Sequence, residues 1–235
     1  VTLDEEGIYL VLTRELPTDE RDALETALVE ALRSPIKVLS FDLVSPAVAR
    51  ETVVAAFWAV VMAALGVFLY LWWAFRNVPS PFRYGVAAVL ALVHDSMVVI
   101  GIFAMLGVLF DVEVNTMFLI ALLTVIGYSV NDTIVIFDRI RENILLYPNR
   151  LLAANANVSI SQSLGRSINT SMTLLFTLLA LLLFGGPTIR VFLWVLVIGV
   201  VVGTYSSIGI ATNFLVSWES GDLRRLLGLR RRQAS

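Results

Sequence analysis

The fold is decided by residues 53–75, VVAAFWAVVMAALGVFLYLWWAF, a run of 23 residues without a charged side chain. A helix rises 1.5 Å per residue, so about 20 apolar residues cross a hydrocarbon core of about 30 Å. The run is therefore long enough to span a membrane as a helix. Tyr70, Trp72 and Trp73 lie toward its end, where aromatic side chains favour the membrane–water interface.

Four further apolar runs follow, interrupted by only a few ionisable residues. The sequence thus predicts five transmembrane helices, over residues 53–75, 85–110, 117–137, 159–184 and 191–218. Composition agrees, because 58% of the residues are hydrophobic, 15% are charged and the mean hydropathy is +0.84, whereas a soluble domain is about a quarter charged. We therefore expect a mainly α, polytopic membrane bundle over residues 51–220.

The first fifty residues are different, because they are acidic and have the patterns of a soluble segment. Ile8–Leu12 predicts a strand, a helix is expected from Pro17-Thr18-Asp19 to Ser34-Pro35, and Ile36–Val44 predicts a second strand. This β-α-β unit is about half of a small α+β domain and buries too little surface to be stable alone. We expect residues 1–50 to be the C-terminal part of such a domain, with its remainder upstream.

Basic residues gather in alternate connections between the apolar runs. They are Arg76 and Arg83, then Arg139, Arg141 and Arg150, and finally Arg224, Arg225, Arg230, Arg231 and Arg232 of the tail. The positive-inside rule places these connections on the cytoplasmic side. Residues 221–235 are then a basic cytoplasmic tail, and residues 1–50 lie in the periplasm or outside the cell. Since the chain starts without Met or a signal peptide, we expect an upstream transmembrane helix and a longer polypeptide.

Several classes of chemistry lack the residues they need. With no Cys and one His, the chain offers no disulfide or thiolate, and a structural zinc site is not expected. It contains no nucleotide-binding loop, nucleophile elbow or HExxH helix. Asp95 and Asp132 lack the Gly-x-Gly-Asp context of an intramembrane aspartyl protease. We expect no catalytic residues, no cofactor, no metal and no bound nucleic acid.

The candidate functional residues are the few ionisable groups inside the apolar runs: His94, Asp95, Asp132 and Arg166. Such groups cost at least ~2.5 kcal/mol each in a membrane helix, so they face protein or water and often mark a pathway. Asp132 lies roughly 7 to 8 Å inside the cytoplasmic edge of its run, and Arg166 is expected at a similar depth. A pair that weakens when a proton neutralises Asp132 would be a proton-coupled switch. A static salt bridge between two helices is equally consistent with the sequence.

Asp95 and its neighbour His94 are adjacent, so they point about 100° apart and are not expected to pair easily. A protonated Asp95 bonded to a neighbouring helix is one interpretation, and a proton relay through either residue is another.

The fourth run has a hydrophilic face. Ser159, Ser163, Ser167 and Ser171 recur every four residues, and Arg166, Thr170, Thr173 and Thr177 form a neighbouring stripe. This face suits helix packing or a water-lined path. In the fifth run, Gly199 and Gly203 form a GxxxG pattern that permits close helix approach. The mixed charges of residues 138–142 are interpreted as an anchor at a helix end.

Residues 127–143, GYSVNDTIVIFDRIREN, closely resemble the signature of the SecF family, or of the SecF half of SecDF. The matching residues are Gly127, Tyr128, Asn131, Asp132, Asp138, Arg139, Arg141 and Glu142. Residues 91–95, ALVHD, followed by Gly101, resemble a second motif of this family. Residues 44–48, VSPAV, resemble a third, although the family usually has Gly where this chain has Ser45.

The resemblance implies an RND-type membrane fold, paired pseudo-symmetrically with a SecD half or subunit, and a ferredoxin-like periplasmic domain. It implies a multi-pass protein of the bacterial cytoplasmic (inner) membrane that uses the proton motive force to help the Sec translocase move preproteins. The implied partners are SecD, the SecYEG translocon, the translocating preprotein, YajC and membrane lipids. Asp132 and Arg166 match the proton-path Asp and Arg of the family, whereas a further essential Asp belongs to the SecD half.

Two other functions fit a bundle with buried charges. One is a proton-coupled RND-type exporter of small molecules or lipids, which usually carries large porter domains. The other is a membrane scaffold in which the charges are structural. The long motif favours the export subunit, without bond-making catalysis.

Overall fold

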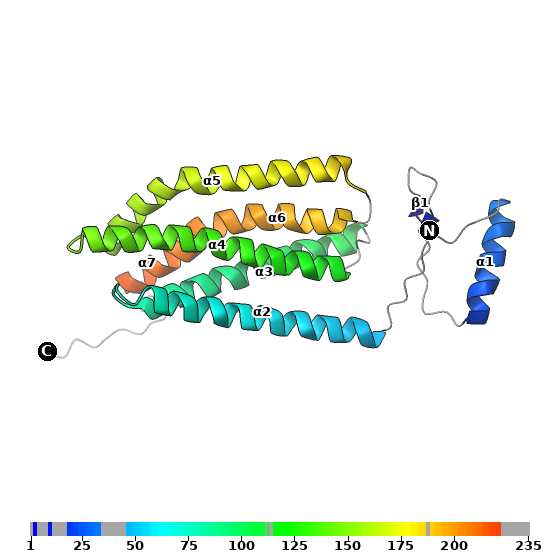
Figure 1. Cartoon of the computed structure of the whole chain (residues 1–235), viewed down its shortest axis with the longest axis horizontal. Helices are drawn as coiled ribbons and strands as arrows, with labels where there is room; N and C mark the ends of the chain where they lie inside the picture. Colours follow the sequence, from blue (N-terminus) through cyan, green and yellow to red (C-terminus); the bar gives the residue numbers. More distant parts are fainter. Residues whose placement is uncertain are drawn as a thin grey trace. The chain divides into compact units, whose positions relative to one another are not determined.

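The computed structural model describes residues 2–3, 9–10, 18–33, 46–110, 112, 115–186 and 189–221 (Figure 1). The chain divides into two compact units, Val1–Ala55 and Ala56–Ser235. The first unit holds strands β1 (Thr2–Leu3) and β2 (Tyr9–Leu10), which pair antiparallel, and helix α1 (Thr18–Leu32). The strand expected at Ile36–Val44 lies outside the described residues, so the ferredoxin-like domain stays a prediction.

The second unit consists of long helices, although the start of α2, up to Ala55, belongs to the first unit. They are α2 (Pro46–Ala74), α3 (Pro81–Phe110), α4 (Thr116–Leu146), α5 (Leu152–Phe184) and α6 (Arg190–Ser206), which continues through the π-helical turn η2 (Ser207–Thr212) into α7 (Asn213–Ser220). Five described helices are long and apolar enough to cross a membrane, the last being the continuous segment Arg190–Ser220. This confirms the predicted mainly α, multi-pass membrane fold.

The ends of the helices extend beyond the apolar runs. α4 continues from Phe137 to Leu146, and α5 begins at Leu152 rather than near Ser159. The charged residues 138–142 therefore lie within α4, where Arg139 pairs with Glu142 and Arg141 with Asp138, each three residues away. Such pairs support a helix in water, so the helix does not need to end where the apolar run ends.

Local sequence explains several helix boundaries. α2 and α3 both begin at a proline, which suits the first turn because it lacks the N–H that would otherwise be unpaired. Asn115 caps α4, its side chain accepting a hydrogen bond from the Phe118 N–H at 3.1 Å. Gly221 ends α7 with φ of +79°, a left-handed conformation that glycine adopts without strain.

Helices α4 and α6 pack against each other at the centre of the bundle, and both contact α3 and α5. Gly199 and Gly203 of α6 face Val125 and Ser129 of α4. A Cβ at Gly199 would overlap the Val125 side chain, and one at Gly203 would lie 2.9 Å from the Ser129 Cβ. The GxxxG pattern thus allows the two helices to approach closely, as the sequence predicts.

Helix α2 packs on the bundle through its C-terminal half. Its buried Leu71 and the nearby Phe75 belong to a cluster with Tyr84 of α3 and Phe137 of α4. The Phe75 and Tyr84 rings stack at 4.9 Å, and Phe137 meets Tyr84 edge-on at 5.4 Å. This apolar layer lies on the side of the bundle where the sequence predicts cytoplasm.

Candidate functional site

Asp132 lies near the midpoint of α4, sixteen residues after Thr116 and fourteen before Leu146. It is buried, with 7% of its surface exposed. The Ser167 hydroxyl, at the middle of α5, donates a hydrogen bond to Asp132 Oδ1 at 2.6 Å. The second oxygen, Oδ2, is also buried and has no hydrogen-bond partner in the described part of the chain. Asp132 is thus a half-satisfied carboxyl group in the interior of a membrane bundle.

Arg166 does not pair with Asp132 in this structure. It is exposed on α5, and the ion pairs among the described residues include none between these two side chains. The expected direct contact is replaced by the bond from Ser167. Successive residues of a helix point about 100° apart, so Ser167 faces α4 and Arg166 turns away.

The two polar stripes of α5 have different surroundings. The serine stripe is buried: Ser159, Ser163, Ser167 and Ser171 are each exposed by 5% or less. The stripe of Arg166, Thr170, Thr173 and Thr177 is exposed. Its three threonines line an open groove of about 480 Å³ together with Tyr128 and Leu174. The serine stripe therefore serves packing within the chain, and the second stripe is left open to whatever surrounds the bundle.

A second polar contact joins α5 to α4 and α6 one turn from Ser167. The Ser171 hydroxyl lies 2.8 Å from the Tyr128 hydroxyl of α4 and 2.6 Å from the Thr204 hydroxyl of α6. It also donates to the Ser167 carbonyl at 2.8 Å. The motif residue Tyr128 thus has a structural partner that spacing alone does not reveal.

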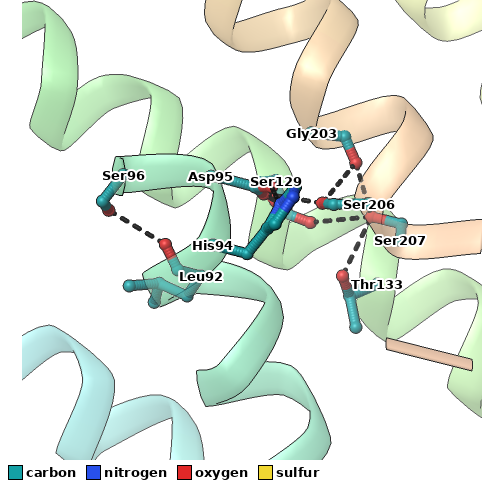
Figure 2. Close-up of polar contacts among 9 residues, drawn as sticks. All are labelled: Leu92, His94, Asp95, Ser96, Ser129, Thr133, Gly203, Ser206 and Ser207. Carbon is teal, nitrogen blue, oxygen red and sulfur yellow. Dashed lines mark hydrogen bonds and ion pairs between the residues drawn. The ribbon is translucent and has the colours of Figure 1, made fainter. Parts of the chain in front are cut away.

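Asp95 is fully buried near the midpoint of α3. Its Oδ2 accepts hydrogen bonds from Ser129 of α4 and from Ser206 of α6, the latter at 2.7 Å (Figure 2). Its Oδ1 lies 3.1 Å from Nδ1 of His94. The expectation that these neighbours would not pair is wrong. The 100° angle describes only the Cβ directions, and the longer imidazole reaches back to the carboxylate.

Hydroxyl groups around the π-helical turn extend this cluster. Ser207, its first residue, lies 2.9 Å from the Thr133 hydroxyl and donates to the Gly203 carbonyl at 2.8 Å (Figure 2). Sequence reasoning missed Ser129, Thr133, Ser206 and Ser207. Adjacent serines within the long apolar run 191–218 were the available signal.

The other motif residues are placed as follows. Gly127 and Asn131 are on an exposed face of α4, and nothing lies within 4 Å of a Cβ built at Gly127. Asp138, Arg139, Arg141 and Glu142 form the ion pairs described above. Among the described residues no group of three or more His, Asp or Glu side chains could hold a metal ion.

Comparison with known proteins identifies the family. Residues 24–221 match the family described as protein export membrane protein SecD/SecF, C-terminal. The protein translocase subunit SecF of Thermobaculum terrenum is 53% identical over 188 residues, which are 80% of this chain and 59% of that protein. The SecF subunit of Anaerolinea thermophila is 46% identical over 225 residues, which are 95% of this chain and 73% of that protein.

A solved structure agrees with these sequence relationships. The crystal structure of SecDF in its super-membrane-facing form is similar to this chain with a TM-score of 0.68 and 32% sequence identity, covering 92% of this chain and 28% of the other. The chain spans 48% to 73% of the length of eight SecF proteins that it matches. The fold, the motifs and these similarities agree: the chain belongs to the SecD/SecF family of protein export membrane proteins, within which it is similar to the SecF subunits.

Proposed function

We propose that this chain is the membrane part of a SecF subunit that uses the proton motive force to promote preprotein translocation across the bacterial cytoplasmic membrane. One observation carries the proposal: Asp132 is buried at the middle of α4, and one of its oxygens has no partner among the described residues. An ionisable group in this position is costly, and such groups commonly mark proton pathways in membrane proteins.

The hydrogen bonding of Asp132 supports exchange of a proton. An ionised carboxylate offers about four acceptor positions, and the described residues supply one donor, from Ser167. The unpartnered Oδ2 keeps its capacity to accept a hydrogen bond or a proton. Protonation would remove a charge at the interface of α4 and α5 and would change how Ser167 holds the carboxyl group. Proton exchange is thereby coupled to the packing of these two helices.

Arg166 is the second part of the proposed switch. It is next to Ser167, so a shift of α5 at Asp132 also moves the guanidinium. In this chain Arg166 is exposed and forms no described ion pair. We place it toward the SecD half, where an acidic group would be its natural partner.

The exposed polar stripe of α5 supports this placement of SecD. The charge of Arg166 is unfavourable against lipid tails. Thr170, Thr173 and Thr177 donate to carbonyls of their own helix, and small polar residues of this kind are frequent where membrane helices pack. The solved relative is a SecDF protein. We extend the partners to the SecYEG translocon, the preprotein and YajC on the basis of family membership.

The test uses the full SecD–SecF pair in inverted vesicles, with Asp132→Asn and Arg166→Met as separate variants. Glu51→Gln is the control, because Glu51 is an exposed carboxylate on α2 and belongs neither to the family signature nor to the site. We expect both variants to assemble and to lose the part of preprotein export that depends on the proton gradient, with the control unchanged. If both variants export like the wild type, the two residues are structural and the proposal fails.

A further inference from the structure

A compact polar cluster holds three helices together beside Asp132. We call it the Asp95 clamp and define it by Asp95 of α3, Ser129 and Thr133 of α4, Ser206 of α6 and Ser207 of η2. Figure 2 shows these side chains converging, with the two serines 129 and 206 on the same carboxylate oxygen. The two carboxylates differ in how they are satisfied. Asp95 has contacts on both oxygens, whereas Asp132 has a described partner on one.

The clamp fixes the approach of α6 to α4. Ser129 and Ser206 come from different helices and donate to one oxygen of a third helix, so that oxygen links all three. Breaking either bond would leave a buried polar group less satisfied, which is costly in a protein interior. Both bonds act where Gly203 already brings α6 within contact distance of Ser129.

The π-helical turn begins directly after the clamp residue Ser206. π-helical turns are rare, and they occur frequently at functional sites. Here the turn is supported by side chains: Ser207 contacts Thr133, and Thr212 donates to the Ser207 carbonyl at 3.1 Å. Ser206, just before the turn, bonds Asp95, and Ser207, its first residue, bonds Thr133. The start of the turn is therefore fixed by contacts from two other helices.

We propose that Asp95 is a positioning residue for Asp132. Ser129 and Thr133 lie one turn apart on α4, on either side of Asp132 in sequence, and both belong to the clamp. They fix the rotation of α4 about its axis, and this rotation points Asp132 at Ser167 of α5. The clamp therefore sets the geometry of the Asp132 carboxyl group. This positioning does not depend on the proposed function. Its importance for proton exchange rests on the proposed function.

The surroundings of Asp95 favour positioning by its hydrogen bonds. In the part of the chain that the structure describes, α4 and α6 present hydroxyl groups to this carboxylate, and the one titratable side chain in contact with it is His94 on its own helix. His94 is one-third exposed and lines a shallow apolar groove of about 380 Å³ with residues such as Met97 and Ile210.

The first measurement follows the π-helical turn by electron paramagnetic resonance. The chain has no cysteine, so nitroxide labels can be attached at Cys residues replacing Val201 and Ser217, on either side of the turn. The test variants are Asp95→Asn and Ser206→Ala in the full SecD–SecF pair, with a cysteine-free SecD. Ser96→Ala is the matched control, because the hydrogen bond described for the Ser96 hydroxyl is to the Leu92 carbonyl of its own helix. We expect a broader distance distribution in both variants and not in the control.

The second measurement follows Asp132 itself. Dicyclohexylcarbodiimide reacts with protonated carboxyl groups in apolar surroundings, so all variants are labelled at one pH. Mass spectrometry of peptides separates the product at Asp132 from that at Asp95. Leaving a buried polar group without its partner shifts an opening equilibrium by roughly 5- to 150-fold. We expect labelling of Asp132 to rise by about this factor in Asp95→Asn and Ser206→Ala, and to be unchanged in Ser96→Ala.

The outcomes separate the two proposals. Unchanged distances, or unchanged Asp132 labelling, in assembled Ser206→Ala protein overturn the positioning role. This variant removes one hydroxyl only, so the test stands even if Asp95→Asn does not assemble. Neither measurement needs proton-driven export, so normal export by Asp132→Asn would overturn the proposed function and leave the positioning role intact.

Discussion

At the scale of single residues, Asp132 depends on one hydroxyl group. Ser167 is its described hydrogen-bond donor and is itself 1% exposed. Asp95, by contrast, has two serine donors and a histidine contact. The difference arises because Asp95 lies where α3, α4 and α6 meet, whereas the hydrogen bond described for Asp132 comes from α5. A carboxyl group held by one protein donor can reorient after one hydrogen bond breaks, whereas a carboxyl group with three contacts must lose several.

Replacing Ser167 with Ala should therefore leave Asp132 Oδ1 without its donor. The expected loss of stability is about 1–3 kcal/mol, the cost of an unsatisfied buried polar group. Thermal or denaturant unfolding of the purified SecD–SecF pair would measure it. Ser161→Ala is the control, because Ser161 is exposed on the same helix. Equal stability of the two variants would show that the Ser167 bond contributes nothing.

The sequence identifies the ionisable residues of the site but not their partners. His94, Asp95, Asp132 and Arg166 stand out because charges are rare in apolar runs. Which of two adjacent residues faces another helix depends on the rotation of both helices. That rotation is set by packing, so an Asp132–Arg166 pair is as reasonable from the sequence as the Ser167 bond that the structure shows.

At the scale of helices, the contact between α4 and α6 depends on two glycines of α6, which have no side chain. Gly199 and Gly203 leave space that Val125 and Ser129 occupy. The same contact brings Ser129 and Ser207 close enough to take part in the Asp95 clamp. Close packing and polar bonding are therefore two aspects of one interface.

Gly199→Ala should destabilise the bundle, because its methyl group overlaps the Val125 side chain. Overpacking of a buried contact typically costs about 1–3 kcal/mol. Gly165→Ala is the matched control, since nothing lies within 4 Å of a Cβ at that position of α5. The control should be neutral or slightly more stable, because alanine favours helix more than glycine does. The melting temperatures of the two variants in detergent would test the difference, and a Gly199→Ala variant as stable as Gly165→Ala would contradict it.

Apolar runs predict that helices exist, but they predict their ends poorly. Length and hydropathy are sufficient for the five spans because a membrane demands both. The helical continuation of α4 beyond Phe137 depends on ion pairs in water, which hydropathy does not register. The start of the π-helical turn contacts the Thr133 hydroxyl of α4, and the preceding Ser206 donates to the Asp95 carboxyl group of α3, so no local pattern in residues 207–212 predicts it.

At the scale of the whole molecule, five spans place successive connections on opposite sides of the membrane. The connections after α2 and α4 then share one side, and those after α3 and α5 share the other. Arg76 and Arg150 belong to the first pair, and Arg83 lies in the adjoining first turn of α3, so the positive-inside rule predicts that this side is cytoplasmic.

Thiol labelling can test this orientation directly, because the chain has no cysteine of its own. A Cys replacing Leu151, 79% exposed between α4 and α5, should react with a membrane-impermeant maleimide in inverted vesicles and not in spheroplasts. A Cys replacing Gly186, between α5 and α6, should show the opposite pattern. Reversed labelling at both positions would invert the predicted topology.

The Asp95 clamp also has a consequence for biogenesis. Ser206 follows Asp95 by 111 residues, so at about 5–20 residues per second a ribosome needs roughly 6 to 22 s to synthesise the partner. Throughout that interval α3 holds a carboxyl group at its midpoint without one of its donors, in surroundings where such a group is costly. The polar contacts of α3 can therefore be completed only after α6 has been made, late in the synthesis of this bundle.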